Sequence, residues 1–103
     1  MAESHVERIH TEPVVLDIGG SIGAPIIYAG EEACGREIEI SLQQQRAPRT
    51  HNQVHERRVH GTAVFAAVYP DLPEGDYDIW RSHDERAGSV RVTGGQIATV
   101  DWR

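Results

Sequence analysis

The segment from Arg49 to Trp80 constrains the fold of this chain more than any other stretch. It contains two strand-like runs, HNQVHERRV and TAVFAAVY, on either side of His60-Gly61. A two-residue loop with glycine in second place supplies the positive φ of a type I′ turn, so the segment predicts a β-hairpin. A corner rich in proline and glycine, PDLPEG, then leads into a further strand that begins near Tyr77.

The two faces of this hairpin differ in chemistry. If Val59 lies opposite Thr62, residues that oppose each other directly share a face. The face with the larger apolar groups is assigned to the core, and it carries Val54, Phe65 and Tyr69. The register pairs polar with small apolar residues on the other face: Gln53 with Val68, His55 with Ala66, and Arg57 with Val64. This second face of the hairpin therefore carries four hydrogen-bonding side chains on one strand: His51, Gln53, His55 and Arg57.

Short strand patterns separated by turn residues recur along the rest of the chain. In REIEISL the alternation points Ile38, Ile40 and Leu42 to one face, as in a half-buried antiparallel strand. Further strands are expected at 14–18, 24–30, 89–93 and 96–102, with a charged connection at 81–88 and a two-residue hairpin turn at Gly94-Gly95. The pattern predicts a flexible arm at 1–12 followed by one all-β domain at 13–103, an antiparallel β-sandwich of about seven to eight short strands.

Composition excludes several classes of function. The net charge of −6 argues against a nucleic-acid interface, which requires a basic face. No apolar run approaches the roughly 20 residues of a membrane span, and the first residues lack the pattern of a signal peptide. The single cysteine, Cys34, cannot form an intramolecular disulfide. We therefore expect a cytoplasmic protein that requires no cofactor.

Parts of the chain resemble known proteins. The corner from Tyr69 to Tyr77 is similar to that of transthyretin-like and carboxypeptidase-regulatory-like β-sandwiches, which implies an immunoglobulin-like or transthyretin-like fold. The segments LDIGGSIGA, EIEIS, the R-x-H…H…R pattern, AAVYPDLPEGDYDIW and VTGGQIATVDW together resemble a group of small actinobacterial proteins often labelled phospholipase. This resemblance extends over most of the chain from Val14 onward.

The favoured function is that of a non-catalytic binding or accessory module. The proposed surface is this polar face of the hairpin strand, where Arg57 and Gln53 would hold a partner protein or a small anionic ligand. An unperturbed histidine side chain has a pKa of about 6.5, so we expect His51 and His55 to make such a contact sensitive to pH. In a sandwich of this size an exposed edge strand also offers a route to a homodimer.

A hydrolase is the first alternative. Gly19 to Gly23 reads G-x-S-x-G, with Ser21 as the candidate nucleophile and His51 or His55 as its base. In an α/β-hydrolase this motif lies between a strand and a helix, whereas the residues after Gly23 favour a strand. A glycine-rich turn explains the same residues.

A histidine-based metal site is the second alternative. On one strand His51 and His55 would lie roughly 13 Å apart, which is too far for both to bind one ion. A metal site would therefore combine His55 with His83 or His10 from elsewhere in the chain.

Overall fold

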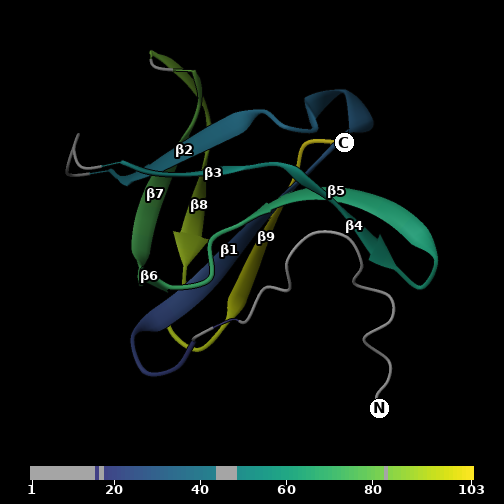
Figure 1. The fold of residues 1–103 in the computed structure, drawn as a ribbon. Coiled ribbons are helices and arrows are strands. Elements are labelled where there is room, and N and C mark those ends of the chain that lie inside the picture. Colours follow the sequence, from purple (N-terminus) through teal and green to yellow (C-terminus); the bar gives the residue numbers. More distant parts are fainter. Residues whose placement is uncertain (1–15, 17, 44–48, 83) are drawn as a thin grey trace.

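The computed structural model describes residues 16, 18–43, 49–82 and 84–103, and within them it shows nine strands and one short 3₁₀ helix in two layers (Figure 1). In chain order the elements are β1 (Ile22–Ala29), η2 (Glu31–Ala33), β2 (Glu37–Leu42), β3 (Thr50–Gln53), β4 (His55–Val59), β5 (Thr62–Val68), β6 (Leu72–Pro73), β7 (Gly75–Ser82), β8 (Glu85–Val92) and β9 (Ile97–Asp101). The expected all-β sandwich is confirmed. The expected arm at 1–12 lies outside the described residues.

The strands form a five-stranded and a four-stranded sheet. In the first, β4, β5, β1 and β6 follow one another and β9 pairs with β1; in the second the order is β3-β2-β7-β8. Every pair is antiparallel except β1 with β9, which run parallel from Ala24 opposite Ile97 to Tyr28 opposite Asp101. The sandwich is therefore antiparallel with one parallel pair.

The expected hairpin at Gly94-Gly95 is wrong, because β8 pairs with β7 and β9 pairs with β1. A tight turn is present, but its backbone bonds to β1 rather than closing a hairpin. The Gly95 amide donates to the Ile22 carbonyl at 2.8 Å, and the Ala24 amide donates to the Gln96 carbonyl at 3.1 Å. These two bonds draw the last strand alongside β1 in the opposite layer.

Burial follows from whether a strand has one or two covered faces. In β2 the side chains alternate, so that Ile38 and Ile40 are buried while Glu37 is exposed. The core between the sheets is formed by side chains from both layers: Ile27, Ala29, Ile38, Ile40, Val54, Ala67, Tyr69, Leu72, Tyr77, Ile79 and Val92. The assignment of Val54 and Tyr69 to the core face of the hairpin is confirmed.

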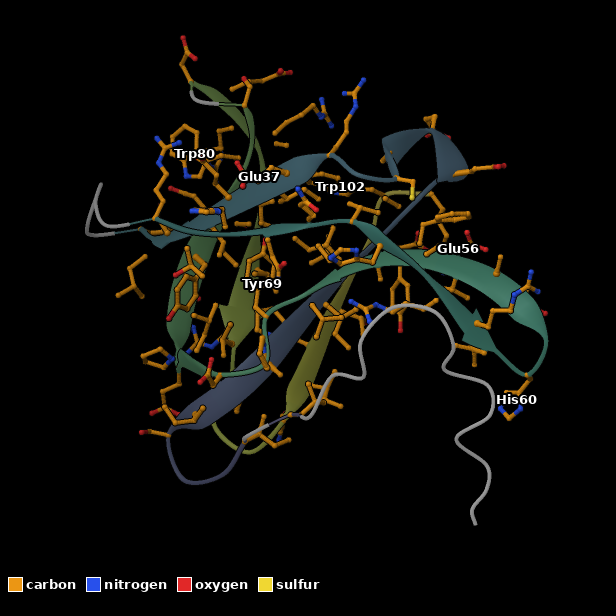
Figure 2. All side chains as sticks on the ribbon, viewed as in Figure 1. Glu37, Glu56, His60, Tyr69, Trp80 and Trp102 are labelled. Atoms are coloured by element: carbon orange, nitrogen blue, oxygen red, sulfur yellow. The ribbon has the colours of Figure 1, made fainter. Side chains whose placement is uncertain are left out.

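Two tyrosine hydroxyls tie separate parts of the chain together. The Tyr69 hydroxyl, which lies between the layers in Figure 2, donates to the Ile38 carbonyl at 2.6 Å and so links the end of β5 to β2. The Tyr77 hydroxyl donates to the Pro73 carbonyl at 2.6 Å. Leu72, in the same corner, is buried. The corner is therefore held by a side-chain bond as well as by its proline and glycine residues.

Two local expectations need correction. The charged connection expected at 81–88 consists largely of strand, because β7 continues to Ser82 and β8 begins at Glu85. The charges are compatible with a hairpin since Arg81 and Glu85 pair across it, with Nη1 and Oε2 at 3.3 Å. Of the strand expected at 14–18, residues 14, 15 and 17 lie outside the described residues, and Leu16 and Ile18 are not in a strand.

The described part of the chain contains no helix long and apolar enough to cross a membrane.

Candidate functional site

The four residues expected to form one polar face are divided between the two sheets. His51 and Gln53 belong to β3, where they lie opposite Glu39 and Glu37 of β2. His55 and Arg57 belong to β4 and pair with β5. The expectation that all four share one hairpin face, with Gln53 opposite Val68, is therefore wrong.

The division occurs at Val54, where β3 passes into β4 (Figure 1). The Val54 amide donates to the Arg36 carbonyl at 2.9 Å, and its carbonyl accepts from the Gly35 amide at 2.8 Å. These bonds hold the preceding residues against β2. Strands that bend from one sheet into the other in this way form the corners of sandwiches.

The β4-β5 hairpin itself has the expected register around His60-Gly61. Val59 lies opposite Thr62 and His55 opposite Ala66. The outer side of this hairpin is nevertheless not an open polar surface, because Ala66 and Val68 are buried there. The apolar run of β5 is typical of a strand covered on both faces. His55 and Arg57 are themselves half-buried, so they do not form the open polar surface that was expected.

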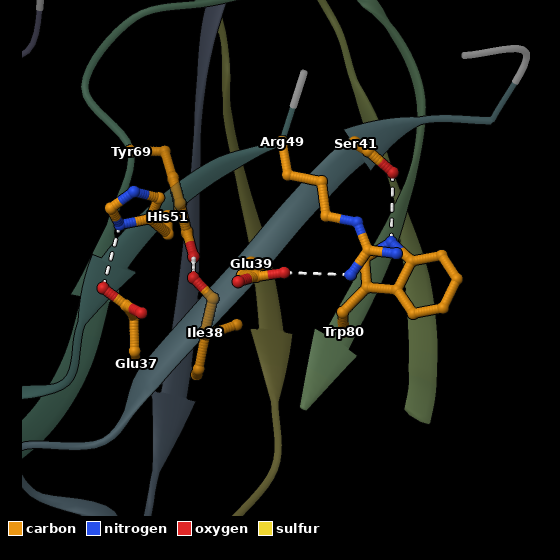
Figure 3. Close-up of polar contacts among 8 residues, drawn as sticks. All are labelled: Glu37, Ile38, Glu39, Ser41, Arg49, His51, Tyr69 and Trp80. Atoms are coloured by element: carbon orange, nitrogen blue, oxygen red, sulfur yellow. Dashed lines mark hydrogen bonds and ion pairs between the residues drawn. The ribbon is translucent and has the colours of Figure 1, made fainter. Parts of the chain in front are cut away.

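The solvent side of the four-stranded sheet, here called the outer face, carries a series of polar side-chain contacts, some of which Figure 3 shows. Carboxylates of β2 and β7 alternate with basic groups from the neighbouring strands. Three ion pairs result: Glu39–Arg49 at 2.9 Å, Asp76–Arg91 at 3.0 Å and Asp78–Arg86 at 2.8 Å. In addition, the Nδ1 atom of His51 lies 2.9 Å from a carboxylate oxygen of Glu37. Each carboxylate on these rungs of β2 and β7 thus has a basic partner.

Trp80 lies in the middle of the outer face, opposite Glu39. The Arg49 guanidinium covers its ring at 3.9 Å from the centroid, and its indole N–H donates to the Ser41 hydroxyl at 3.0 Å. Cation–π contact and the indole hydrogen bond together hold the ring in place (Figure 3). The contact between Trp80 and Arg49 was not predicted from the sequence.

A pocket of about 270 Å³ opens at the end of the sandwich where β1, β2 and β7 meet η2 and the C-terminal residues. We call it the end pocket. It is lined by Ala29, Gly30, Glu32, Ala33, Arg36, Glu37, Ile38, Arg81 and Trp102. Trp102 is held by its amide, which donates to the Tyr28 carbonyl at 2.8 Å, and it lies near Glu37 in Figure 2.

Two arginines flank the apolar part of the end pocket. Arg36 continues the alternation that turns Ile38 and Ile40 inward, and Arg81 continues that of Tyr77 and Ile79. The Arg81 guanidinium lies 5.2 Å from the centroid of the Trp102 ring and also pairs with Glu85. Within the described residues Arg36 has no ion-pair partner.

The two acidic residues of the end pocket differ in orientation. Glu37 points its carboxylate to the outer face, where it pairs with His51. Glu32 folds back over Gly30, so that a Cβ added to Gly30 would lie 2.6 Å from both carboxylate oxygens of Glu32. Of the two acidic lining residues in the described chain, Glu32 is thus the one whose carboxylate has no partner. The sequence did not predict this site, because its residues come from three parts of the chain: 29–38, Arg81 and Trp102.

Ser21, the candidate nucleophile, lies in the exposed turn before β1. Its carbonyl accepts from the Glu74 amide at 2.8 Å, and the described residues show no hydrogen bond from its hydroxyl to a histidine. Of its two expected bases, His51 is in the other sheet and pairs with Glu37, and His55 lies in β4 opposite Ala66. The geometry brings together no triad around Ser21 in the described chain.

The glycines around Ser21 have a structural explanation. Gly20 has a φ of +56°, and a Cβ on Gly23 would lie 2.4 Å from the Thr93 carbonyl oxygen. A Cβ on Gly94 would meet the Gly20 carbonyl oxygen at 2.0 Å. The turn before β1 and the turn after β8 therefore pack backbone against backbone, which requires glycine on both sides.

The described part of the chain contains no group of three or more histidine, cysteine or acidic side chains that could hold a metal ion. His55 lies in β4, opposite Ala66. His10 and His83, the other residues of the metal-site hypothesis, lie outside the described residues. Cys34 is exposed and unpaired.

β8 is an edge of the four-stranded sheet and a candidate for pairing between copies. Trp80 of β7 pairs with Arg86 of β8, and the register between the two strands shifts on both sides of this pair. Bulges and charged side chains are devices by which edge strands avoid further pairing. The homodimer through an edge strand stays a prediction.

The fold and this geometry define a small all-β sandwich with a self-paired outer face and an open end pocket. Comparison with protein-family models, with curated proteins and with solved structures gives no match.

Proposed function

We propose that this protein is a non-catalytic binding module that holds a small ligand bearing an anionic group in the end pocket. One observation carries the proposal: two arginines flank an apolar pocket, and Arg36 has no ion-pair partner in the described chain. The function expected from the sequence is kept, and its surface moves from the polar strand face to the end pocket.

The chemistry of the lining suits such a ligand. A guanidinium presents a planar fork of N–H donors that matches a carboxylate or a phosphate, so Arg36 and Arg81 supply the anionic recognition. Ala29, Ala33 and Trp102 offer apolar surface for the rest of the ligand. Pockets for small molecules combine an apolar lining with few polar groups in this way. The volume of about 270 Å³ lies just below the range of about 300–1,000 Å³ of such pockets, which restricts the ligand to a small one.

The outer face is a weaker candidate because its charges already have partners. An anion that approached Arg49 would compete with Glu39, and one that approached Arg91 would compete with Asp76. An anion that approaches Arg36 displaces no carboxylate of the described chain.

Fluorescence of Trp102 provides a direct test. The chain has two tryptophans, so Trp80→Phe leaves Trp102, in the pocket lining, as the only one. In this variant we expect 3-phenylpropanoate to change the Trp102 emission in a saturable way, and its neutral amide, 3-phenylpropanamide, to have little effect. Adding Arg36→Ala should weaken carboxylate binding about tenfold, the equivalent of roughly 1.4 kcal/mol.

Arg91→Ala in the same background is the matched control. It also removes an arginine, but one that lies on the outer face and pairs with Asp76. Carboxylate binding should remain unchanged in this control. The proposal would be wrong if the carboxylate failed to saturate the signal up to ~10 mM, or if it bound equally well after Arg36→Ala.

A further inference from the structure

We infer that the ligand of the end pocket is dipolar, with an ammonium group as well as a carboxylate on a small apolar body, as in a free apolar amino acid. This inference rests on the proposed function and names the ligand class of the same pocket. Its basis is that Glu32 and Arg36 line one pocket and yet do not pair with each other.

Glu32 lines the pocket, and its carboxylate lies beside Gly30, which lines the pocket as well. Both of its oxygens occupy the space beside Gly30 that a side chain at that position would fill. Gly30 has a φ of −84°, which any residue adopts, so the missing side chain is not required by the backbone. Glycine at this position leaves room for the carboxylate.

The charges around this carboxylate are incompletely matched. Within the described residues Glu32 has no hydrogen bond or ion pair from its side chain. Arg36, four residues later, is also without an ion-pair partner there, whereas Arg81 is shared between Glu85 and the Trp102 ring. The end pocket thus presents one acidic and one basic group that remain available to a ligand.

This arrangement disfavours ligands of a single sign. A ligand with only a carboxylate would meet Arg36 favourably and Glu32 unfavourably, and a simple amine would meet the reverse. A ligand with both groups satisfies both residues. Its apolar part would lie against Ala33, Ile38 and Trp102, which line the same pocket.

Three probes with the same phenyl body separate the possibilities: L-phenylalanine, 3-phenylpropanoate and phenethylamine. In the Trp80→Phe protein we expect L-phenylalanine to bind most tightly, followed by the carboxylate and then the amine. The gain of the amino acid over the carboxylate should be about fivefold, as for an ion pair that is open to solvent.

Glu32→Gln tests the role of the acidic group. It should weaken L-phenylalanine about fivefold and strengthen 3-phenylpropanoate about twofold, because the same charge attracts the ammonium and repels the carboxylate. Glu31→Gln is the matched control, since Glu31 is adjacent in η2 and does not line the pocket. Thermal melting checks that each variant is folded.

Gly30→Ala gives an independent test without a change in charge. The added methyl group would displace the Glu32 carboxylate, which is the far end of a flexible side chain, so folding should be preserved. The variant should lower the preference for L-phenylalanine over 3-phenylpropanoate.

The outcomes distinguish the two proposals. If 3-phenylpropanoate binds and depends on Arg36, while Glu32→Gln leaves the ratio of the two affinities unchanged, the dipolar ligand is wrong and the anion-binding module stands. If neither probe binds, both proposals are wrong. Opposite shifts of the two affinities in Glu32→Gln would support both.

Discussion

The outer face and the end pocket are built on the same strand, and they differ in how far their charges are neutralised. On the outer face Glu37 and Glu39 of β2 have partners on β3 or beside it. In the end pocket Arg36, which immediately precedes β2, has no ion-pair partner in the described chain. The comparison separates charged residues that stabilise a surface from charged residues that can bind a ligand.

The physical reason lies in the position of each residue along its strand. On a rung within a sheet, the neighbouring strands place side chains opposite one another at roughly 5 Å, where opposite charges pair readily. Just before β2 the residue bonded to Arg36 is Val54, whose apolar side chain supplies no opposite charge. Clusters at the ends of sheets are therefore the better place to search for function in a small sandwich.

The largest expected effect concerns Tyr69, whose hydrogen bond to Ile38 underlies both regions. Tyr69→Phe should lower the free energy of unfolding by about 1–3 kcal/mol, because it removes a buried hydrogen bond and leaves a carbonyl less well satisfied. Urea denaturation measures the change. Tyr28→Phe is the control and should alter the stability little, since the Tyr28 hydroxyl makes no hydrogen bond in the described chain. Equal losses in the two variants would contradict this role for Tyr69.

Tyr69 also predicts a dependence of stability on alkaline pH. Burial, with a smaller contribution from Glu37 and Glu39, raises the pKa of Tyr69 well above its ordinary value of 10.0. The folded state therefore holds this proton more tightly than the unfolded chain does. The protonated Tyr69 hydroxyl therefore contributes fully to the free energy of unfolding below pH 10. As the pH rises above 10 this contribution decreases, by about 1 kcal/mol at pH 11.

Urea denaturation of the wild type and of Tyr69→Phe between pH 8 and about 11 isolates this effect. The variant should lose less stability over this range. Some dependence will remain, because burial also raises the pKa of Tyr77. An identical decline in both proteins would show that Tyr69 does not titrate as described.

The smallest effects distinguish ion pairs within the outer face. Arg49→Ala should lower the free energy of unfolding by about 0.5–1 kcal/mol, because it removes the cation–π contact with Trp80 and an ion pair with Glu39. The side chains of that pair are 23% and 22% exposed, whereas Arg91 is 75% exposed in its pair with Asp76. Arg91→Ala should therefore change the stability by less than about 0.5 kcal/mol.

Neither substitution should alter ligand binding in the end pocket. A loss of 3-phenylpropanoate binding in Arg49→Ala, with the protein still folded, would mean that the outer face and the end pocket are not separate sites. Equal destabilisation by the two arginine substitutions would show that burial does not distinguish the two pairs.

Much of the fold was predictable because it depends on short-range patterns. The alternation in REIEISL turned Ile38 and Ile40 inward, as predicted, and the hairpin register around His60-Gly61 is confirmed. The predicted hairpin at Gly94-Gly95 was wrong because a glycine pair indicates a tight turn but not the sheet to which the next strand belongs. That choice depends on backbone bonds to β1, which lies some 70 residues earlier in the chain.

The candidate site was less predictable than the fold. His51, Gln53, His55 and Arg57 alternate regularly along the sequence, and this alternation suggested one polar face. It did not show that the strand changes sheets at Val54, which depends on hydrogen bonds to Gly35 and Arg36. The residues of the end pocket could not be recognised in the sequence, because an isolated arginine at the end of a strand resembles any other charged surface residue.

By itself the amino-acid sequence determined that this chain forms strands, where most of them lie, and which side chains of each strand are apolar. These properties follow from a side-chain period of two, which is local. Only the tertiary structure decided which strands pair, where β3 leaves its neighbour, and that Arg36, Arg81 and Trp102 meet around one pocket. Those properties depend on contacts between distant segments, and for such contacts a local period contains no information.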